Sequence, residues 1–169
     1  MGRVLYEVTY QLDTRLLIPF VVLLGFSMVA VKEFKEIRLK GSVKGHLFNV
    51  CVLPFSLIIL IFVCCATVAT QVDMYKNIVV AYQEGQYETV EGRVENFVPM
   101  PYEGHAQETF QIDGVGFAYS DYSTIPGYHN AKSHGGVVTG DGQNLTIRYV
   151  YYEPSDCNVI VYIEEMDSK

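Results

Sequence analysis

The sequence lacks a disulfide framework. It has four cysteines, and three of them (Cys51, Cys64 and Cys65) lie within one apolar run, which leaves Cys157 alone in the remainder of the chain. A small disulfide-stapled domain needs paired cysteines within itself, so this class of protein is excluded. Because no basic neighbour would lower its pKa, we expect Cys157 to be a small, partly buried side chain rather than a reactive thiol.

Charge is absent from one long stretch. Residues 47–72 contain no Asp, Glu, Lys or Arg. This run is longer than the roughly 20 apolar residues that a helix needs to cross the hydrocarbon core. A buried helix of a soluble protein usually keeps a polar face, which this run lacks. We therefore predict a transmembrane helix at 47–72.

A shorter apolar run, residues 16–31, lies between Arg15 and Lys32. Its length falls short of the hydrocarbon thickness, but the long stems of the two flanking side chains can keep their charges at the interface. A signal peptide would have a short basic start and a cleavage site, which this segment does not have. We therefore predict that 16–31 is a further transmembrane helix.

Basic residues are scarce in the last part of the sequence. Residues 73–169 hold five Lys or Arg and fifteen Asp or Glu, a net charge of −10, whereas residues 1–72 hold seven and four, a net charge of +3. The acidic part repels polyanions, so nucleic acid is excluded as a partner. The connector at 32–46 is basic, and the positive-inside rule places it in the cytoplasm. Both termini and the acidic part are then predicted to be extracytoplasmic.

Residues 1–15 form a β-like N-terminal segment. The residues Val4, Tyr6, Val8, Tyr10 and Leu12 alternate with Leu5, Glu7, Thr9 and Gln11, which places β-favouring side chains on one face with the period of two that is typical of a strand. A lone strand is unstable because its backbone groups need partners. One hypothesis is that this segment pairs with a sheet edge of the acidic domain, and the alternative is a flexible or interfacial lead-in.

The acidic domain, residues 73–169, is predicted to be β-rich with a short leading helix. The helix is expected to continue from the second span to Gly85. Strands are expected at 87–97, 109–112, 115–119, 145–152 and 158–164, with a tight hairpin turn at Asp113-Gly114. Five short strands in so few residues favour a small twisted barrel of the OB or SH3-like kind, with Gly92 at a bend.

The strings VEGRVENFVPMPYEGHAQETFQIDGVGFAYSDY and PGYHNAKSHGGVVTGDG carry a resemblance. They are similar to the C-terminal domain of a family of small, mostly uncharacterised bacterial membrane proteins, in which one or more spans precede this β domain. The resemblance covers roughly residues 75–165. It implies the fold and a bacterial source, hence the plasma membrane, and it carries no known activity.

Two long connections, 98–108 and 120–144, interrupt the strands, and loops of this length are often functional. They hold the candidate binding residues His105, Ser120, Asp121, Tyr122, His129, His134, Gly135 and Gly136. The histidine spacing fits no standard metal motif, no nucleophile elbow is present, and the glycines lack a P-loop lysine. We therefore expect no catalytic residue, metal or cofactor. The alternative is structural: Ser120 and Asp121 would bond loop amides, and the glycines would allow positive φ.

The leading hypothesis is a non-enzymatic, membrane-anchored binding or assembly module with the lipid bilayer and a protein partner or a second copy as its contacts. Two alternatives stay open. One is a membrane effector of a bacterial defence or competition system, gated by a ligand in the barrel. The other is a metal-dependent enzyme, for which residues such as Glu108 and the loop histidines would supply ligands.

Overall fold

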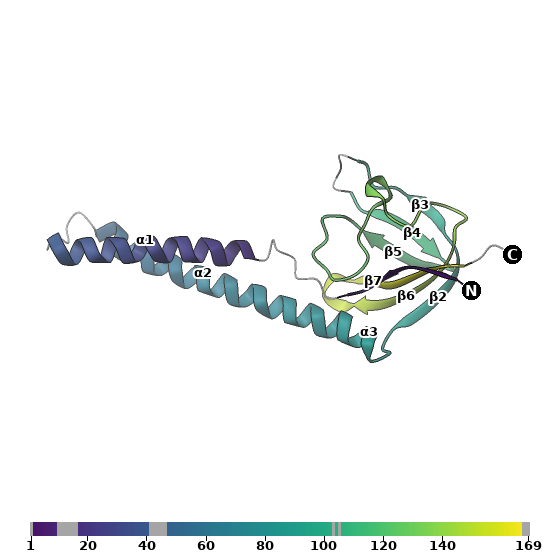
Figure 1. Ribbon diagram of the computed structural model, residues 1–169, viewed down its shortest axis with the longest axis horizontal. Coiled ribbons are helices and arrows are strands. Elements are labelled where there is room, and N and C mark those ends of the chain that lie inside the picture. The colour runs from purple at the N-terminus through teal and green to yellow at the C-terminus, as the bar shows by residue number, and fades with distance from the viewer. Residues whose placement is uncertain (1, 10–16, 41–46, 103, 105, 167–169) are drawn as a thin grey trace. The chain divides into compact units, whose positions relative to one another are not determined.

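The computed structural model describes residues 2–9, 17–40, 47–102, 104 and 106–166 (Figure 1). The chain forms two compact units. One comprises residues 12–72, and the other combines residues 1–11 with residues 73–169.

The first unit is helical. It contains α1 (Ile18–Lys40) and α2 (Leu47–Met74). Among the described residues, one helix is long and apolar enough to cross a membrane, from Pro54 to Gln83. The prediction of two transmembrane helices is not supported by this measure, because the uncharged part of α1 ends at Val31. Helical backbone also continues to Lys40, so most of the predicted connector is helix rather than loop.

Large apolar side chains on both helices are exposed rather than buried. Phe62 in α2 is 73% exposed and Val21 in α1 is 66% exposed. Hydroxyl groups bond within their own helices, since Ser27 donates to the Leu23 carbonyl at 2.7 Å and Thr67 to the Val63 carbonyl at 2.9 Å. Internal pairing of this kind suits a helix in hydrocarbon, where water cannot serve as a partner.

The helix continues beyond α2, as the sequence predicts. A π-helical turn, η2 (Tyr75–Val80), and a last turn, α3 (Ala81–Gln83), follow α2 without a break. Gly85 then adopts a φ of +79°, a conformation that glycine accepts without steric cost and that ends the helix.

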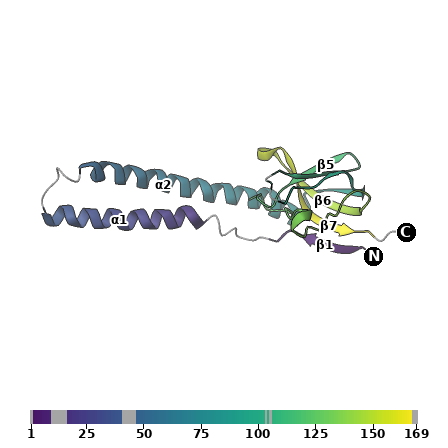
Figure 2. The same cartoon turned by 90° about the horizontal axis from the view of Figure 1, so that it is seen from above.

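The second unit contains two antiparallel sheets (Figures 1 and 2). The strand order in the four-stranded sheet is β1-β7-β6-β2, and the order in the three-stranded sheet is β3-β4-β5. The strands are β1 (Arg3–Glu7), β2 (Glu88–Arg93), β3 (Glu95–Val98), β4 (Glu108–Ile112), β5 (Val115–Tyr119), β6 (Asn144–Tyr152) and β7 (Cys157–Glu165).

The predicted β-rich domain is confirmed, but its described strands form two separate sheets and not the closed cylinder of a barrel of the OB or SH3-like kind. The expected strand at 87–97 divides at Val94, whose side chain is buried and whose N–H donates to the Gln143 carbonyl at 2.9 Å. β2 thus stays in one sheet while β3 passes into the other. Gly92 lies near this corner, where a Cβ would be 3.1 Å from the Ile112 side chain, closer than ordinary van der Waals contact. At the opposite side the sheets do not join, since β5 has β4 as its one strand partner in the described chain.

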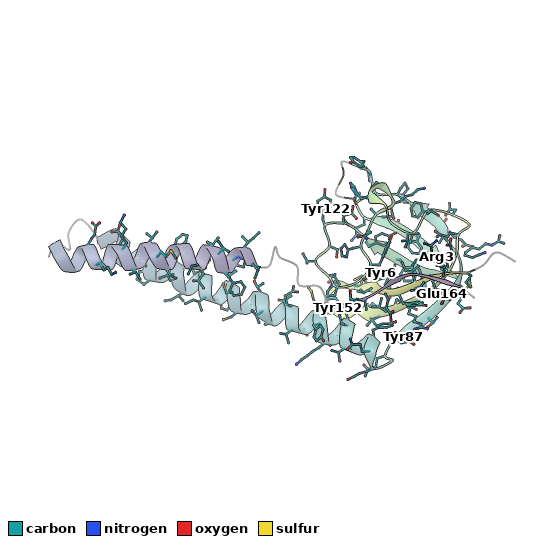
Figure 3. The ribbon with its side chains drawn as sticks, viewed as in Figure 1. Arg3, Tyr6, Tyr87, Tyr122, Tyr152 and Glu164 are labelled. Atoms are coloured by element: carbon teal, nitrogen blue, oxygen red, sulfur yellow. The ribbon has the colours of Figure 1, made fainter. Side chains whose placement is uncertain are left out.

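The hypothesis that the N-terminal segment joins the sheet is confirmed. β1 pairs with β7 in antiparallel register, with Val4 opposite Glu164 and Tyr6 opposite Ile163. Figure 3 labels Arg3 and Tyr6 on β1 and Glu164 on β7. The Val8 N–H continues this pairing by donating to the Val161 carbonyl at 2.8 Å. Residues 10–16 lie outside the described residues, so the pairing applies to the first part of the predicted segment.

Two hydrophobic cores lie on opposite faces of the four-stranded sheet. The larger fills the space between the sheets and includes Phe110, Phe117, Leu145 and Ile163, each at most 3% exposed. The smaller core packs η2 against the other face through seven buried residues: Val8, Ile78, Val79, Val150, Tyr152, Val159 and Val161. Burial on both faces explains why β6 and β7 are rich in Val, Ile and Tyr.

Candidate functional site

Glu108, at the start of β4, organises the two long loops. Its side chain is 0% exposed. The carboxylate accepts hydrogen bonds from the Tyr119 hydroxyl at 2.6 Å, the Lys132 N–H at 3.1 Å and the Met100 N–H at 3.3 Å. Because those donors belong to both loops and to β5, one buried carboxylate fixes all three segments. A buried charge is tolerated when it is hydrogen-bonded in this way.

Asp121 provides a further connection within the second loop. Its carboxylate accepts the Ala131 N–H at 2.6 Å and pairs with Nδ1 of His134. The His134 ring also packs against Tyr102 of the first loop, with ring centroids 4.9 Å apart. The structure therefore brings Asp121 and His134 together, but as a pair that orders the loops. The Ser133 hydroxyl lies 3.4 Å from the same Nδ1. Among the described residues, no third His, Cys, Asp or Glu completes a metal-ligating group with them.

The other predicted site residues are dispersed. The Ser120 hydroxyl oxygen accepts the Tyr122 N–H at 3.3 Å, the turn that the structural alternative predicted. His129 bonds through Nδ1 to the Gly127 carbonyl at 2.8 Å. Gly135 has a φ of +89°, and a Cβ on Gly136 would lie 2.2 Å from the Asn130 carbonyl oxygen. His105 lies outside the described residues. Figure 3 shows Tyr122 in the loop that follows β5.

Tyrosines surround the loop base. Burial, together with the hydrogen bond to Glu108, holds the pKa of Tyr119 far above its usual range. Burial also raises the pKa of Tyr128 to about 12. With a pKa this high, Tyr128 is neutral at physiological pH. Its hydroxyl oxygen accepts the Val137 N–H at 2.6 Å. Neither tyrosine is poised to exchange protons near neutral pH.

Two hollows border the edge of β5. The first, about 520 Å³, is lined by Asn96, Thr109, Gln111, Gly116 and Tyr151 among others. The second, about 430 Å³, is lined by residues that include the predicted site residues Ser120 and Tyr122. Both hollows share four lining residues, namely Ala118, Asp156, Cys157 and Asn158. The two hollows therefore meet where β5 lies opposite the turn between β6 and β7, and we call this combined surface the β5 groove.

Backbone groups along the β5 groove are not paired with another strand. Asp113 and Gly114 both have positive φ, which makes the β4–β5 turn a two-residue turn and Ile112–Val115 a hydrogen-bonded pair. Because such pairs alternate, Gly116 and Ala118 direct their N–H and C=O groups away from β4. Asn158 donates its side-chain amide to the Gly116 carbonyl at 3.0 Å. Within the described residues, no hydrogen bond reaches the Gly116 N–H or either backbone group of Ala118.

The wall opposite β5 carries an aromatic ring and a carboxylate. Tyr151 is 55% exposed, and its hydroxyl donates to Oδ1 of Asp156 at 2.7 Å. Asp156 occupies the turn in a left-handed conformation, with φ of +48°. Next to it, burial and the Asp156 carboxylate raise the pKa of the Cys157 thiol, as expected for an unreactive cysteine. The combination suits a cation, because both the ring face and the carboxylate attract positive charge.

Sequence reasoning missed the two features that define this region. The sequence predicts Glu108 at the end of a loop, but the residue lies in β4 and alternates together with the buried Phe110 and Ile112. An acidic residue at a position that alternates with buried side chains is the signal that the sequence offers. The free edge of β5 has no signal in the sequence, because strand neighbours depend on tertiary structure. In the loop entry at 99–101, the Met100 side chain is 2% exposed and packs inside the domain.

Comparisons with protein-family models, curated proteins and solved structures found no match to this chain.

Proposed function

We propose that this protein is a membrane-anchored binding or assembly module that performs no chemistry of its own. The observation that carries the proposal is the β5 groove: two joined hollows beside an unpaired strand edge, on a domain whose loops are fixed by a buried carboxylate. Rigid loops beside a preformed concavity favour recognition, because little ordering entropy is lost when a partner binds. The raised pKa values of the surrounding tyrosines and of Cys157 offer no group suited to acid–base or nucleophilic catalysis.

The proposed anchor consists of two spans, α1 and α2. Because β1 and β7 belong to one sheet, the segments before α1 and after α2 lie on the same side of any membrane. The chain between them must then cross an even number of times. If α2 crosses, a second crossing is required, and α1 is the described helix with exposed apolar side chains, such as Val21 and Met28 at 66% and 63% exposure. This parity supports the shorter span despite its length.

For the orientation, we propose that the β domain is extracytoplasmic in a bacterial plasma membrane. The support is the distribution of charge: five Lys or Arg lie at 32–46, between the helices, and the β domain is acidic. The resemblance to small bacterial membrane proteins supports the same assignment. Because the number of membrane crossings is even, residues 2–9 lie on the same side of the membrane as the β domain, whichever side that is.

Thiol labelling in intact spheroplasts tests the anchor. In a background with the four native cysteines replaced by serine, Glu91→Cys and Arg3→Cys should react with a membrane-impermeant maleimide, since both positions are exposed strand residues. Lys35→Cys should react only after the spheroplasts are permeabilised. Labelling of Arg3→Cys and Glu91→Cys from opposite sides would refute the even number of crossings. Labelling of Lys35→Cys in intact spheroplasts, with Glu91→Cys protected, would reverse the orientation.

Site-specific photo-crosslinking tests the binding function. A photoreactive amino acid at Tyr122, in the β5 groove, is compared with one at Thr89, an exposed position of β2 that does not line the groove. In cells that express the full chain, the Tyr122 position should give a discrete adduct and the Thr89 position should not. Equal patterns from both positions, or no adduct from Tyr122, would reject the binding module.

A further inference from the structure

We propose that the β5 groove binds an extended, cationic peptide segment as an additional β-strand. This inference rests on the proposed binding function and names the chemistry of the partner. It begins with the hydrogen bonds that β5 leaves unmade. The N–H of Gly116 and both backbone groups of Ala118 face away from β4, two residues apart, which is the spacing at which a neighbouring strand supplies its own groups.

Asn158 indicates how this edge is completed. Its side-chain amide donates to the Gly116 carbonyl at 3.0 Å, as the backbone N–H of a paired strand would. Along the rest of this edge, Gly116 and Ala118 are exposed and have almost no side chain, so a peptide backbone can approach closely. An added strand would pair with the remaining groups of β5, while the hollows on either side accommodate its side chains.

The four sheet edges of the domain differ in a way that points to β5. Edge strands usually carry charged residues that prevent pairing with other chains. β1 (RVLYE), β2 (ETVEGR) and β3 (ENFV) follow this rule, each with at least one charged residue. β5 (VGFAY) contains no charged residue and no proline. Among the described edges, β5 is thus the one whose own residues include no charge, while Asn158 occupies its Gly116 carbonyl alone.

Charge decides which peptide fits. Asp156 and the exposed ring of Tyr151 face the groove together, and a Lys or Arg side chain could contact both. The domain as a whole, residues 73–169, has a net charge of −10. The same charge disfavours a second copy of this domain, since two acidic surfaces would be brought together. We therefore assign the groove to a cationic peptide of another chain rather than to self-association.

The experiment uses three hexapeptide probes and the full chain in phosphatidylcholine nanodiscs, with empty nanodiscs as the control. The probes alternate Val with Lys, alternate Val with Glu, or repeat the Val–Lys sequence with every second amide methylated. Binding is measured by fluorescence anisotropy. The Val–Lys peptide should bind about tenfold more tightly than the Val–Glu peptide, and methylation of the amides that face β5 should remove binding.

Two protein variants locate the interaction. Ala118→Pro removes the outward N–H and leaves the β4–β5 ladder intact, because the paired residues are Phe117 and Tyr119. It should lower Val–Lys affinity about tenfold, whereas Ala118→Ser, which keeps the N–H, should not. Asp156→Asn should weaken the preference for Lys over Glu without loss of backbone pairing.

Several results would overturn the inference: no Val–Lys binding, equal binding of the Lys and Glu probes, tolerance of amide methylation, or dimerisation of the protein that Ala118→Pro abolishes. The methylated probe leaves the protein unchanged, so the result does not depend on how a variant folds. If the Tyr122 adduct in cells persists in the Ala118→Pro variant, strand addition is rejected but the binding function is not. Absence of that adduct would reject the binding function itself.

Discussion

Phe62 and Phe110 have the same side chain and opposite environments. Phe62, in α2, is 73% exposed, and Phe110, in β4, is 1% exposed. The β domain buries its apolar side chains between its own sheets, whereas the helices display theirs outward. Exposed apolar surface of this extent is unfavourable in water and needs another apolar phase, which we propose for α2 is the bilayer. One region therefore makes its own hydrophobic core, and the other presents the apolar surface on which the proposed membrane anchor rests.

The largest expected effect comes from truncating these two phenylalanines. Phe110→Ala should lower the free energy of unfolding of the β domain by about 3–5 kcal/mol, because it creates a cavity between the sheets. Phe62→Ala should change it by less than about 0.5 kcal/mol, because that side chain packs on no core of the domain. Chemical denaturation of the full chain in detergent micelles, followed by near-ultraviolet circular dichroism of the tyrosines, provides the measurement. Similar losses for both variants would contradict the comparison.

A smaller effect should follow from removal of the buried carboxylate. Glu108→Ala leaves the Tyr119 hydroxyl and the Lys132 and Met100 N–H groups without an acceptor, which should cost about 3 kcal/mol of folding free energy. Glu88→Ala is the matched control, because Glu88 also accepts a tyrosine hydroxyl, that of Tyr149 at 2.6 Å, but is exposed. Its loss should be at most about 1 kcal/mol. Equal losses would show that Glu108 does not organise the loops.

Alkaline pH should destabilise the β domain selectively. The folded-state pKa values of Tyr6 and Tyr128 are raised from 10.0 to about 12, mainly by burial. A raised folded-state pKa contributes stability that is fully present below the unfolded value and is lost as pH rises through the folded value. The free energy of unfolding should thus fall between pH 10 and about 12, in denaturation curves recorded at stepped pH. A constant free energy across that window would contradict the burial of these hydroxyls.

The smallest expected effect is a difference in thiol reactivity between Cys157 in the β domain and Cys65 in α2. Because its pKa is raised by burial and by Asp156, Cys157 should react slowly with a water-soluble maleimide at neutral pH. Asp156→Asn should increase that rate about twofold, since less thiol then remains protonated. Cys65, exposed on α2, should react with a membrane-permeant reagent and not with the water-soluble one. Each rate is measured in a single-cysteine variant, and rapid modification of Cys65 by the water-soluble reagent would show that α2 is outside lipid.

Local patterns predicted much of the fold. The uncharged run at 47–72 predicted α2, the Asp113-Gly114 pair predicted the β4–β5 hairpin, and the alternation of residues 4–8 predicted a strand. Each of these features depends on residues that are adjacent or nearly adjacent in sequence. The candidate site was predicted less well. Ser120 and Tyr122 do line a hollow, but Asp121, His129 and His134 hold the loops in place.

The sequence by itself determined where the chain is apolar, where it is acidic and which segments alternate, because these properties belong to single residues and to their spacing. Only the tertiary structure decided that the sheets stay separate, that Glu108 is buried and that β5 is left with a free edge. Those outcomes depend on which distant segments share a sheet. β2 and β3 enter different sheets on either side of Val94, and the free edge of β5 lies beside a turn instead of a paired strand. Pairing between distant strands is a property of the whole fold, and no local period encodes it.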